Sequence, residues 1–363
     1  MRTPRENMLS LYRRTGYDWA PVSFSLCPDM EAKRKAAMPP GVSFGEYFDY
    51  PEGFASAYVP GPKRIPRQDP DWRKFFTEPL HETTTFSDYG VAMEGGHAGT
   101  HHLRRMHHPM AQFDSLEQLQ AYPWPEWDWQ DIGHMVPVVK DAQAKGLPVL
   151  AGMGCTLWET SWYIRDMTAL MMDMTEGDAK AVYLLDRVTE DSARRAAAFA
   201  RAGADIIMTG DDIGMQKSIM MSLDMYREWL KPRLAKVIAA AKAIKPDILI
   251  HYHSCGYVEP YIADLMEAGV DILNPVQPEC MEFAKLHAEY GDRWSFNGTL
   301  GTQTTMPFGS AKDVRDVVFR NLDTAGAKGG LMVCPTHLLE PEVPWENVEA
   351  YVKACRDYSR GKG

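Results

Sequence analysis

Residues 248–273 read ILIHYHSCGYVEPYIADLMEAGVDIL, and this run places two short apolar segments around one segment with helical periodicity. The pattern predicts a strand over 248–253, a helix over 258–268 and a second strand over 271–273. A strand, a helix and another strand in this order are typical of a parallel sheet with right-handed crossovers. The run is therefore predicted to be one unit of an α/β fold.

The same alternation extends through the chain from residue 147 onward. Further strands are predicted at 148–151, 205–209, 295–297 and 330–333, and further helices at 186–202, 222–243, 281–290 and 310–325. So many units favour a (β/α)8 TIM barrel over an open sheet. Because no Pro/Gly/Ser-rich linker divides this half, residues 1–363 are predicted to form a single domain, with regular units over 147–363.

Residues 1–146 are less regular and are predicted to form an elaboration at the N-terminal side of the barrel. We expect a short helix over 3–14, a strand over 21–26, an irregular aromatic-rich segment over 39–70, and a β-ribbon made from 83–86 and 101–106. The aromatic residues of the third segment have two interpretations. They either cover an apolar ring of a bound molecule or pack in the core.

Composition and charge limit the partners of the chain. Of the 363 residues, 45% are hydrophobic and 24% charged, which is typical of a globular protein with a large core. The net charge of −10 argues against nucleic acid and anionic membrane surfaces, since both require cationic patches. No apolar run approaches the roughly 20 residues of a membrane span, and the opening residues lack the apolar region of a secretory signal. We therefore expect a cytoplasmic protein, and the sequence is compatible with a homodimer.

Nucleotide binding is disfavoured by the glycine pattern. The segment Ala151-Gly-Met-Gly-Cys155 lacks the third glycine of the dinucleotide-binding fingerprint, and the P-loop spacing is absent. The chemistry is expected instead at the ends of the barrel strands.

The strand at 248–253 and the residues after it carry the strongest candidates. His251, His253 and Cys255 alternate along the chain, so their side chains can share one face and point into the barrel mouth. Imidazole and thiolate are ligands that zinc prefers, and His253 and Cys255 therefore predict a metal site. The alternative is a hydrogen-bonded histidine in the lumen beside a small buried cysteine. His251 is a candidate for contact with the substrate.

A tetrahedral site needs further ligands, and the last strand supplies two. Cys334 and His337 follow it closely, and either can complete the site. Glu279 is a candidate oxygen ligand, or a base that acts behind the ligands.

Other strand ends carry polar or aromatic side chains. Asp211 and Asp212 can orient a cationic or hydroxyl-bearing group or act as general base, with Asp211 as the catalytic candidate, and for Asp212 a helix cap is an equally good interpretation. Asn297 can exchange a hydrogen bond with a substrate. Trp158 is a candidate substrate contact, with core packing beside Trp162 as the alternative.

Five histidines crowd the stretch from residue 94 to residue 109, where glycines interrupt the pattern. Because irregular backbone does not fix these side chains on one face, we favour a substrate-facing role for His97 or His101 over a second metal centre.

Several segments spread along the chain share one resemblance. They are Thr3-Pro-Arg-Glu-Asn7, Gly210-Asp-Asp-Ile-Gly214, His253-Ser-Cys-Gly256, Gly269-Val-Asp-Ile-Leu-Asn-Pro-Val-Gln277, Asn297-Gly-Thr-Leu-Gly-Thr-Gln303 and Pro344-Trp-Glu-Asn347. Together they resemble the uroporphyrinogen decarboxylase-like superfamily over essentially the whole chain. The resemblance implies a TIM barrel.

The resemblance also separates two branches of that superfamily. True uroporphyrinogen decarboxylases carry an Arg-Gln-Ala-Gly-Arg motif after the first strand, which grips the tetrapyrrole propionates, whereas residues 23–30 here read SFSLCPDM. The chain is more similar to the corrinoid-dependent methyltransferase branch, whose zinc is held by His-x-Cys and a later cysteine. This likeness implies zinc on His253 and Cys255, with His337 or Cys334 as the third ligand.

The implied reaction moves a methyl group between a small methylated substrate and a corrinoid bound to a partner protein. The aromatic residues at 44–58 favour an aryl methyl ether as the substrate. A decarboxylase and a non-catalytic barrel that binds a corrinoid or tetrapyrrole are the alternatives.

Overall fold

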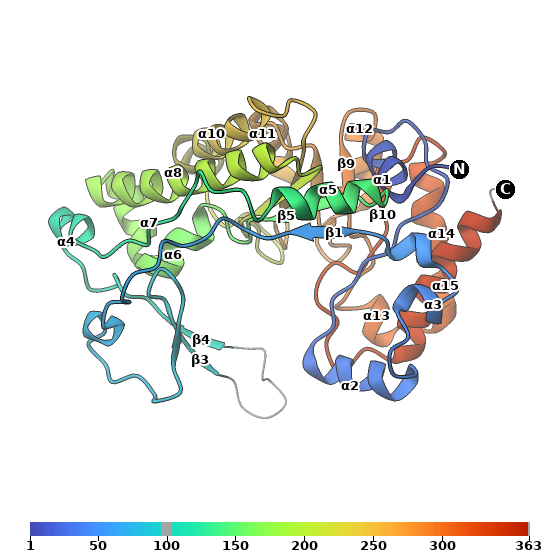
Figure 1. Cartoon of the computed structure of the whole chain (residues 1–363), viewed down its shortest axis with the longest axis horizontal. Helices are drawn as coiled ribbons and strands as arrows, with labels where there is room; N and C mark the ends of the chain where they lie inside the picture. Colours follow the sequence, from blue (N-terminus) through green and yellow to red (C-terminus); the bar gives the residue numbers. More distant parts are fainter. Residues whose placement is uncertain (96–103, 362–363) are drawn as a thin grey trace.

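The computed structural model describes residues 1–95 and 104–361. Within these ranges, seven parallel strands form one curled sheet in the order β1-β5-β6-β7-β8-β9-β10 (Figure 1). The strands are β1 (Ala57–Val59), β5 (Val149–Gly152), β6 (Ile206–Gly210), β7 (Leu249–His253), β8 (Ile272–Asn274), β9 (Ser295–Asn297) and β10 (Leu331–Met332). Each strand from β5 onward pairs with the next along the chain. The predicted parallel α/β architecture of the TIM-barrel type is confirmed.

Eight regular strands were predicted, and the structure differs at the place where the first and last strands of the sheet, β1 and β10, would close the barrel; this place is called the seam. In the described part of the chain no ladder joins these two strands, and the strand predicted at 21–26 is wrong. That segment instead runs extended and makes a single parallel bridge from Leu26 to Leu339. Pro21 has no N–H to offer a ladder, and the N–H of Val22 donates to the carbonyl of Gly53 at 2.9 Å.

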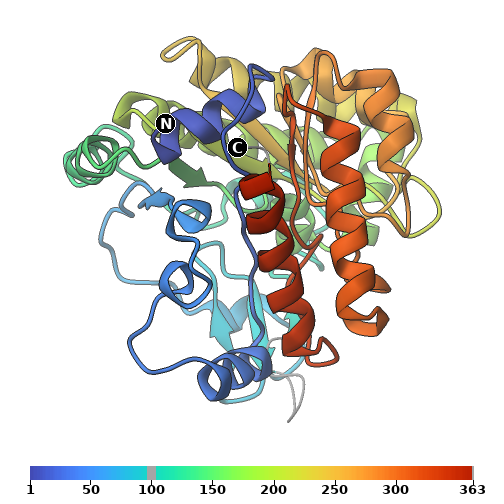
Figure 2. The ribbon, with the colours of Figure 1, turned by 90° about the vertical axis from the view of Figure 1, so that its right-hand side faces the viewer.

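Helices alternate with the strands and cover the sheet. They are α5 (Val136–Ala144), α6 (Trp158–Arg165), α7 (Met167–Glu176), α8 (Ala179–Ala202), α9 (Leu223–Met225), α10 (Lys231–Lys242), α11 (Ile262–Ala268), α12 (Phe283–Tyr290), α13 (Thr305–Phe308), α14 (Ala311–Ala325) and α15 (Trp345–Gly361). In Figure 2, α14 and α15 lie side by side. No helix of the described ranges combines the length and the apolar character needed to cross a membrane.

The helix predicted over 222–243 is interrupted. A π-helical turn, Tyr226–Leu230, separates α9 from α10. Pro232 explains the interruption, because its ring clashes with the carbonyl four residues earlier and it offers no N–H. The wider π turn accommodates this proline without ending the helix.

The N-terminal part adds short elements around the barrel. They are α1 (Pro4–Tyr12), α2 (Pro28–Ala37), α3 (Phe44–Tyr47), the 3₁₀ turns η1 (Pro51–Phe54) and η2 (Trp72–Phe75), α4 (Leu116–Gln120), and an antiparallel ribbon of β2 (Thr85–Phe86), β3 (Ala92–Gly95) and β4 (Arg104–His107). The ribbon was expected from two of these strands. Helix α1 starts with a capping box between Thr3 and Glu6. It ends before the predicted position because Arg14 adopts a left-handed conformation, with φ of 56°.

The aromatic residues of the N-terminal part pack on one another. The rings of Phe24 and Phe44 lie 4.9 Å apart, and those of Phe44 and Phe54 lie 5.6 Å apart. Phe48 and Tyr50 are buried in the same cluster. Core packing, the second interpretation of this segment, therefore accounts for these rings.

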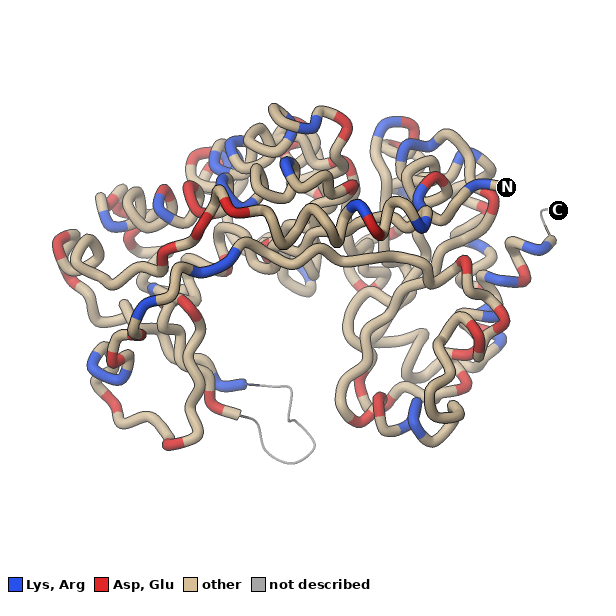
Figure 3. The backbone as a smooth tube through the Cα atoms, in the orientation of Figure 1, with Lys and Arg blue, Asp and Glu red and all other residues tan. Residues whose placement is uncertain are grey.

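Charged residues of both signs are interspersed along the outer helices (Figure 3). Many of them pair, as Arg233 does with Asp186 at 2.7 Å. The net negative charge of the chain is thus spread over the molecule.

One buried ion-pair cluster joins α11 to the π turn and α10. The carboxylate of Asp264 has 4% of its surface exposed and accepts hydrogen bonds from Arg227 Nε at 3.0 Å and Lys231 Nζ at 2.7 Å. Burial opposes the charged form, but these two cations outweigh it and lower the pKa of Asp264.

We expect Asp264→Asn to lower the free energy of unfolding by about 1–3 kcal/mol at neutral pH, because a charge-assisted pair is lost. A carboxyl whose pKa is lowered by folding stabilises the protein above its unfolded pKa, near 3.9, and this stabilisation is lost as the pH falls through the folded value. Urea unfolding at pH 7 and pH 3 should therefore show the two proteins converging at the lower pH. An equal difference at both values would contradict the assignment, and Asp316→Asn, in an exposed pair with Lys312, serves as the control.

Candidate metal centre

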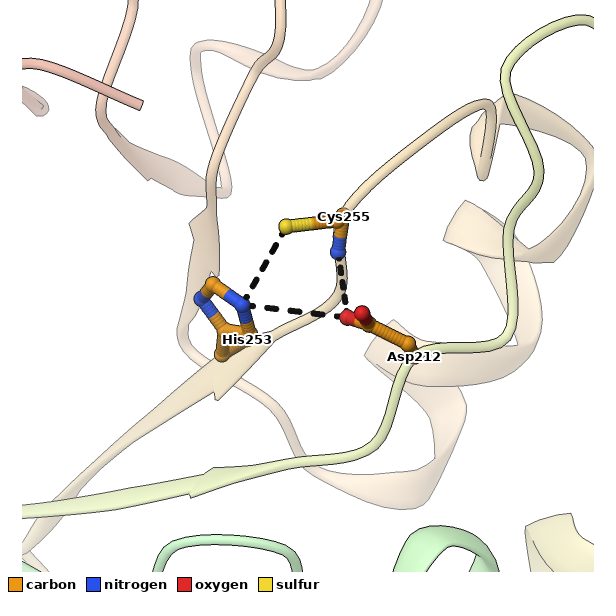
Figure 4. Close-up of side chains that lie close together, drawn as sticks. All are labelled: Asp212, His253 and Cys255. Atoms are coloured by element: carbon orange, nitrogen blue, oxygen red, sulfur yellow. Dashed lines mark hydrogen bonds and ion pairs between the residues drawn. The ribbon is translucent and has the colours of Figure 1, made fainter. Parts of the chain in front are cut away.

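Three side chains converge where β6 and β7 end (Figure 4). His253 is the last residue of β7, Cys255 follows two residues later, and Asp212 follows β6. The register pairs Gly210 with His253. Glycine is required there, because a Cβ at residue 210 would lie 2.5 Å from the carbonyl oxygen of His253. This close approach brings the two strand ends, and the side chains that follow them, together.

The donor atoms of this cluster fit a tetrahedral metal. His253 Nε2 lies 3.4 Å from Cys255 Sγ and 3.7 Å from Asp212 Oδ1, and all three donor atoms lie within 4.8 Å of one another. Zinc binds nitrogen, oxygen and sulfur at about 2.0–2.3 Å, so two ligands of a tetrahedral ion are about 3.3–3.8 Å apart. The nitrogen–sulfur and nitrogen–oxygen separations match this spacing, and the donor set is one that zinc prefers.

Hydrogen bonds hold Asp212 in this position. Its Oδ1 accepts from the backbone N–H of Cys255 at 2.7 Å, and its own N–H donates to Glu159 Oε2 at 3.0 Å. Glu159 in turn accepts from the hydroxyl of Tyr163 at 2.7 Å. Burial and the neighbouring Asp212 carboxylate raise the pKa of Glu159. The loop after β6 is thus anchored to α6 on one side and to the loop after β7 on the other.

The thiol of Cys255 is held in its protonated form by its surroundings. Burial, and then the negative charge of Asp212, raise its pKa to about 12. A divalent cation reverses this balance, because a coordinating thiol loses its proton. The site is therefore suited to a cation and unsuited to a free nucleophilic thiolate at neutral pH.

An open cavity of about 330 Å³ borders Cys255. Its described lining combines polar and apolar groups and includes neither lysine nor arginine; the residues are Gly214, Met215, Gln216, Cys255, Gly256, Gln277, Thr302, Gln303, Thr336, His337, Leu338 and Glu340. A small molecule can therefore reach the thiol from the barrel mouth.

The two adjacent aspartates lie in different surroundings. Asp212 does not cap the next helix, α9, which is capped by Ser222. Asp211, expected to act as a base, is buried, and its carboxyl group accepts from the N–H of Leu157 at 3.0 Å and of Glu159 at 2.9 Å. Side-chain alternation along a strand could have found this, since it places residue 212 on the side of residue 210 and residue 211 on the other.

The alternative third ligands lie apart from the cluster. Cys334 is buried, and its thiol donates to Asn297 Oδ1 at 2.9 Å. His337 is exposed and lines the same cavity as Cys255. Neither belongs to the group of His253, Cys255 and Asp212 within the described residues. Their role as ligands stays a prediction.

Two further candidates are held by other contacts. Glu279 Oε1 accepts from the N–H of Gln303 at 3.1 Å and from Thr304 Oγ1 at 2.9 Å, away from the three donor atoms. Trp158 is fully buried, and its indole N–H points to the sulfur of Met220 at 3.3 Å, as the core-packing alternative requires.

Among the described residues, His251 does not belong to the cluster. His251 is 5% exposed and faces an interior cavity of about 70 Å³ between the sheet and the N-terminal segments. Burial, and then the proximity of His253, lower its pKa to about 3, so it is neutral at physiological pH. His97 and His101 lie outside the described residues. The substrate contacts expected of all these side chains stay predictions.

A comparison with protein families gives a match over nearly the whole chain. The model of the uroporphyrinogen decarboxylase (URO-D) family matches residues 3–358. The chain belongs to the URO-D family. No curated protein sequence matches this URO-D family member.

Solved structures are similar to this URO-D family member to different degrees. A methyltransferase from Methanosarcina mazei is similar over 99% of each chain, with a TM-score of 0.66 and 18% identity. A B12-independent methionine synthase from Shewanella sp. W3-18-1 is similar over 62% of this chain and 66% of its own, with a TM-score of 0.40 and 13% identity. Xylanase 10B from Thermotoga maritima covers 64% of this chain and 83% of its own, with a TM-score of 0.41 and 12% identity.

Proposed function

We propose that this URO-D family member is a zinc-dependent methyltransferase, which moves a methyl group between a small methylated substrate and a corrinoid bound to a partner protein. The observation that carries the proposal is the convergence of Asp212, His253 and Cys255 beside an open cavity. The similarity to a methyltransferase over 99% of each chain supports the reaction class. We place the reaction in the cytoplasm, where the free cysteines stay reduced.

In this proposal, His253 Nε2, Cys255 Sγ and Asp212 Oδ1 hold the metal. Three protein ligands leave one position open for substrate, as in catalytic zinc sites. Bound zinc supplies Lewis acidity, which lowers the pKa of a heteroatom or stabilises it as a leaving group. Glu159 accepts from the backbone N–H of Asp212, and the backbone N–H of Cys255 holds the Asp212 carboxylate toward the other two donors. The side-chain amides of Gln216, Gln277 and Gln303 line the cavity through which a substrate enters.

The cavity beside Cys255 argues against a porphyrinogen decarboxylase. The several carboxylates of a tetrapyrrole would need convergent arginines for charge-assisted binding, and the described lining offers none. The rings of Phe44, Phe48 and Phe54 pack against one another, so they do not single out an aryl methyl ether. The proposed substrate is therefore a small methylated molecule.

Methyl transfer can be followed by the absorbance of methylcobalamin. The purified chain is expected to be inert alone, and to form methylcobalamin when reduced cobalamin is added with its methylated substrate. The screen should include methanol, methylamines, methylated thiols and methoxyarenes. Removal of zinc by a chelator should abolish the signal, and readdition of zinc should restore it.

Two outcomes would overturn this proposal. Turnover of uroporphyrinogen that survives chelation would mean a decarboxylase. Tight cobalamin binding without turnover of any methylated compound, in protein that holds no zinc, would mean a non-catalytic binding barrel.

A further inference from the structure

The Nδ1 atom of His253 is hydrogen-bonded to a chain of side-chain amides that continues through Asn274 and Asn297. His253 Nδ1 lies 2.6 Å from Asn274 Oδ1. Asn274 Nδ2 donates to Asn297 at two atoms, to Oδ1 at 3.0 Å and to the backbone oxygen at 3.3 Å. Asn297 Nδ2 donates to the hydroxyl of Tyr12 at 2.8 Å. The chain thus runs from the end of β7 through the ends of β8 and β9 to α1.

The backbone oxygen of Asn297 sets the direction of the hydrogen bonds in this series of side chains. The backbone oxygen of Asn297 can only accept, so the end of the Asn274 amide that faces it must be the NH₂ group. The other end, Oδ1, faces His253 and can itself only accept. Nδ1 of His253 must therefore carry a hydrogen, and in the neutral ring Nε2 carries the lone pair. Nε2 is the nitrogen that faces Cys255 and Asp212.

The far end of the chain fixes the orientation of Asn297. Its Oδ1 receives the N–H of Asn274, so its Nδ2 must point to Tyr12. The thiol of Cys334 donates to the same Oδ1 at 2.9 Å. Burial raises the pKa of Cys334 to about 12, in agreement with a protonated thiol that donates. The donor from Cys334 thus helps to prevent a 180° flip of the Asn297 side-chain amide.

We propose that Asn274 and Asn297 are positioning residues of the metal centre, which hold His253 in the tautomer that presents Nε2 to the metal. In this arrangement Cys334 acts as a hydrogen-bond donor to Asn297 and does not bind the metal. The proposal rests on the proposed function only in taking zinc as the metal. Ligating histidines commonly donate their other ring N–H to such an acceptor, and loss of that acceptor typically costs 10–100-fold in metal affinity.

The tautomer of His253 can be measured without any metal. Long-range ¹H–¹⁵N spectra of metal-free protein with labelled histidines should show His253 protonated at Nδ1. In Asn274→Ala we expect a mixture of both tautomers, and a zinc dissociation constant raised about 10–100-fold. Asn274→Asp keeps the acceptor and should keep the Nδ1–H tautomer.

Two controls distinguish an effect on the position of His253 from the general effect of losing a buried amide. Asn321→Ala removes a buried asparagine that bonds Thr299, and it should leave the His253 signals and the zinc affinity unchanged. Cys334→Ser retains a hydroxyl donor and should bind zinc like the wild type, whereas Cys334→Ala should weaken binding.

A wild-type tautomer and wild-type zinc affinity in Asn274→Ala would overturn the positioning role. So would a loss of zinc from Cys334→Ser as severe as that from Cys255→Ala, since it would make Cys334 a ligand. Should the wild-type protein bind no zinc, the proposed function fails, and the tautomer of His253 in Asn274→Ala still decides the role of the amide chain.

Discussion

Replacing His253 and Cys255 together by alanine is expected to abolish zinc binding, from about one ion per chain to none. The remaining donor of the cluster, Asp212, cannot hold the ion alone, because affinity depends on several preformed ligands. Metal analysis of protein purified without chelator gives the stoichiometry. Retention of full zinc in the double variant would place the metal elsewhere.

Zinc binding by single variants, measured in the same assay, identifies the third ligand. We expect Asp212→Ala to weaken zinc binding most strongly, because its Oδ1 lies 3.7 Å from His253 Nε2. His337→Ala and Cys334→Ser should have small effects. Asp212→Asn is the matched control, since it keeps the size and removes the charge. Loss of zinc from His337→Ala, with Asp212→Ala unaffected, would instead support the ligand set His253, Cys255 and His337, one of the two sets that the resemblance implies.

Replacing Asp211 by alanine is expected to lower the free energy of unfolding by about 2–4 kcal/mol, because it leaves the buried N–H groups of Leu157 and Glu159 without an acceptor. Burial, and then the neighbouring Glu159 carboxyl, raise the pKa of Asp211 to about 8 against the effect of these N–H donors. An amide resembles the protonated carboxyl, so Asp211→Asn should cost much less. Urea unfolding of the three proteins at neutral pH measures both differences.

The same variants test the expectation that Asp211 is a general base. In the structure it organises the start of α6, so Asp211→Asn should keep zinc and methyl transfer. Loss of methyl transfer from Asp211→Asn, with stability and zinc content unchanged, would restore the catalytic role.

The regular half of the fold could be predicted because its signals are local. The strand around residue 250 and the helix that follows it show their periodicity within a few residues. The strand lies within one residue of the prediction, and the helix ends where predicted but starts at Ile262, after a 3₁₀ turn over Glu259–Tyr261. The strand expected at 21–26 is wrong because its partner lies more than 300 residues away, and no local pattern shows that Leu26 would touch Leu339 only once.

The candidate site could be predicted in part for the same reason. His253 and Cys255 share one short segment, so their alternation was enough to pair them. The contribution of Asp212 depends on the register between β6 and β7, which pairs Gly210 with His253. The link to Asn274 depends in the same way on the next register, which pairs that residue with His253. Neither register is encoded in a local pattern.

The hydrogen bonding between neighbouring strands differs between the two sides of the barrel. In the part of the chain that the structure describes, β6 and β7 are joined along five consecutive residue pairs. The extended segment at 21–26 makes one bridge, to Leu339, which lies after the end of β10. The ladder that positions Asp212, His253 and Cys255 is therefore continuous, whereas on the opposite side the sheet is interrupted. There the segment at 21–26 is held by the Leu26–Leu339 bridge and by packing of Phe24 against Tyr351.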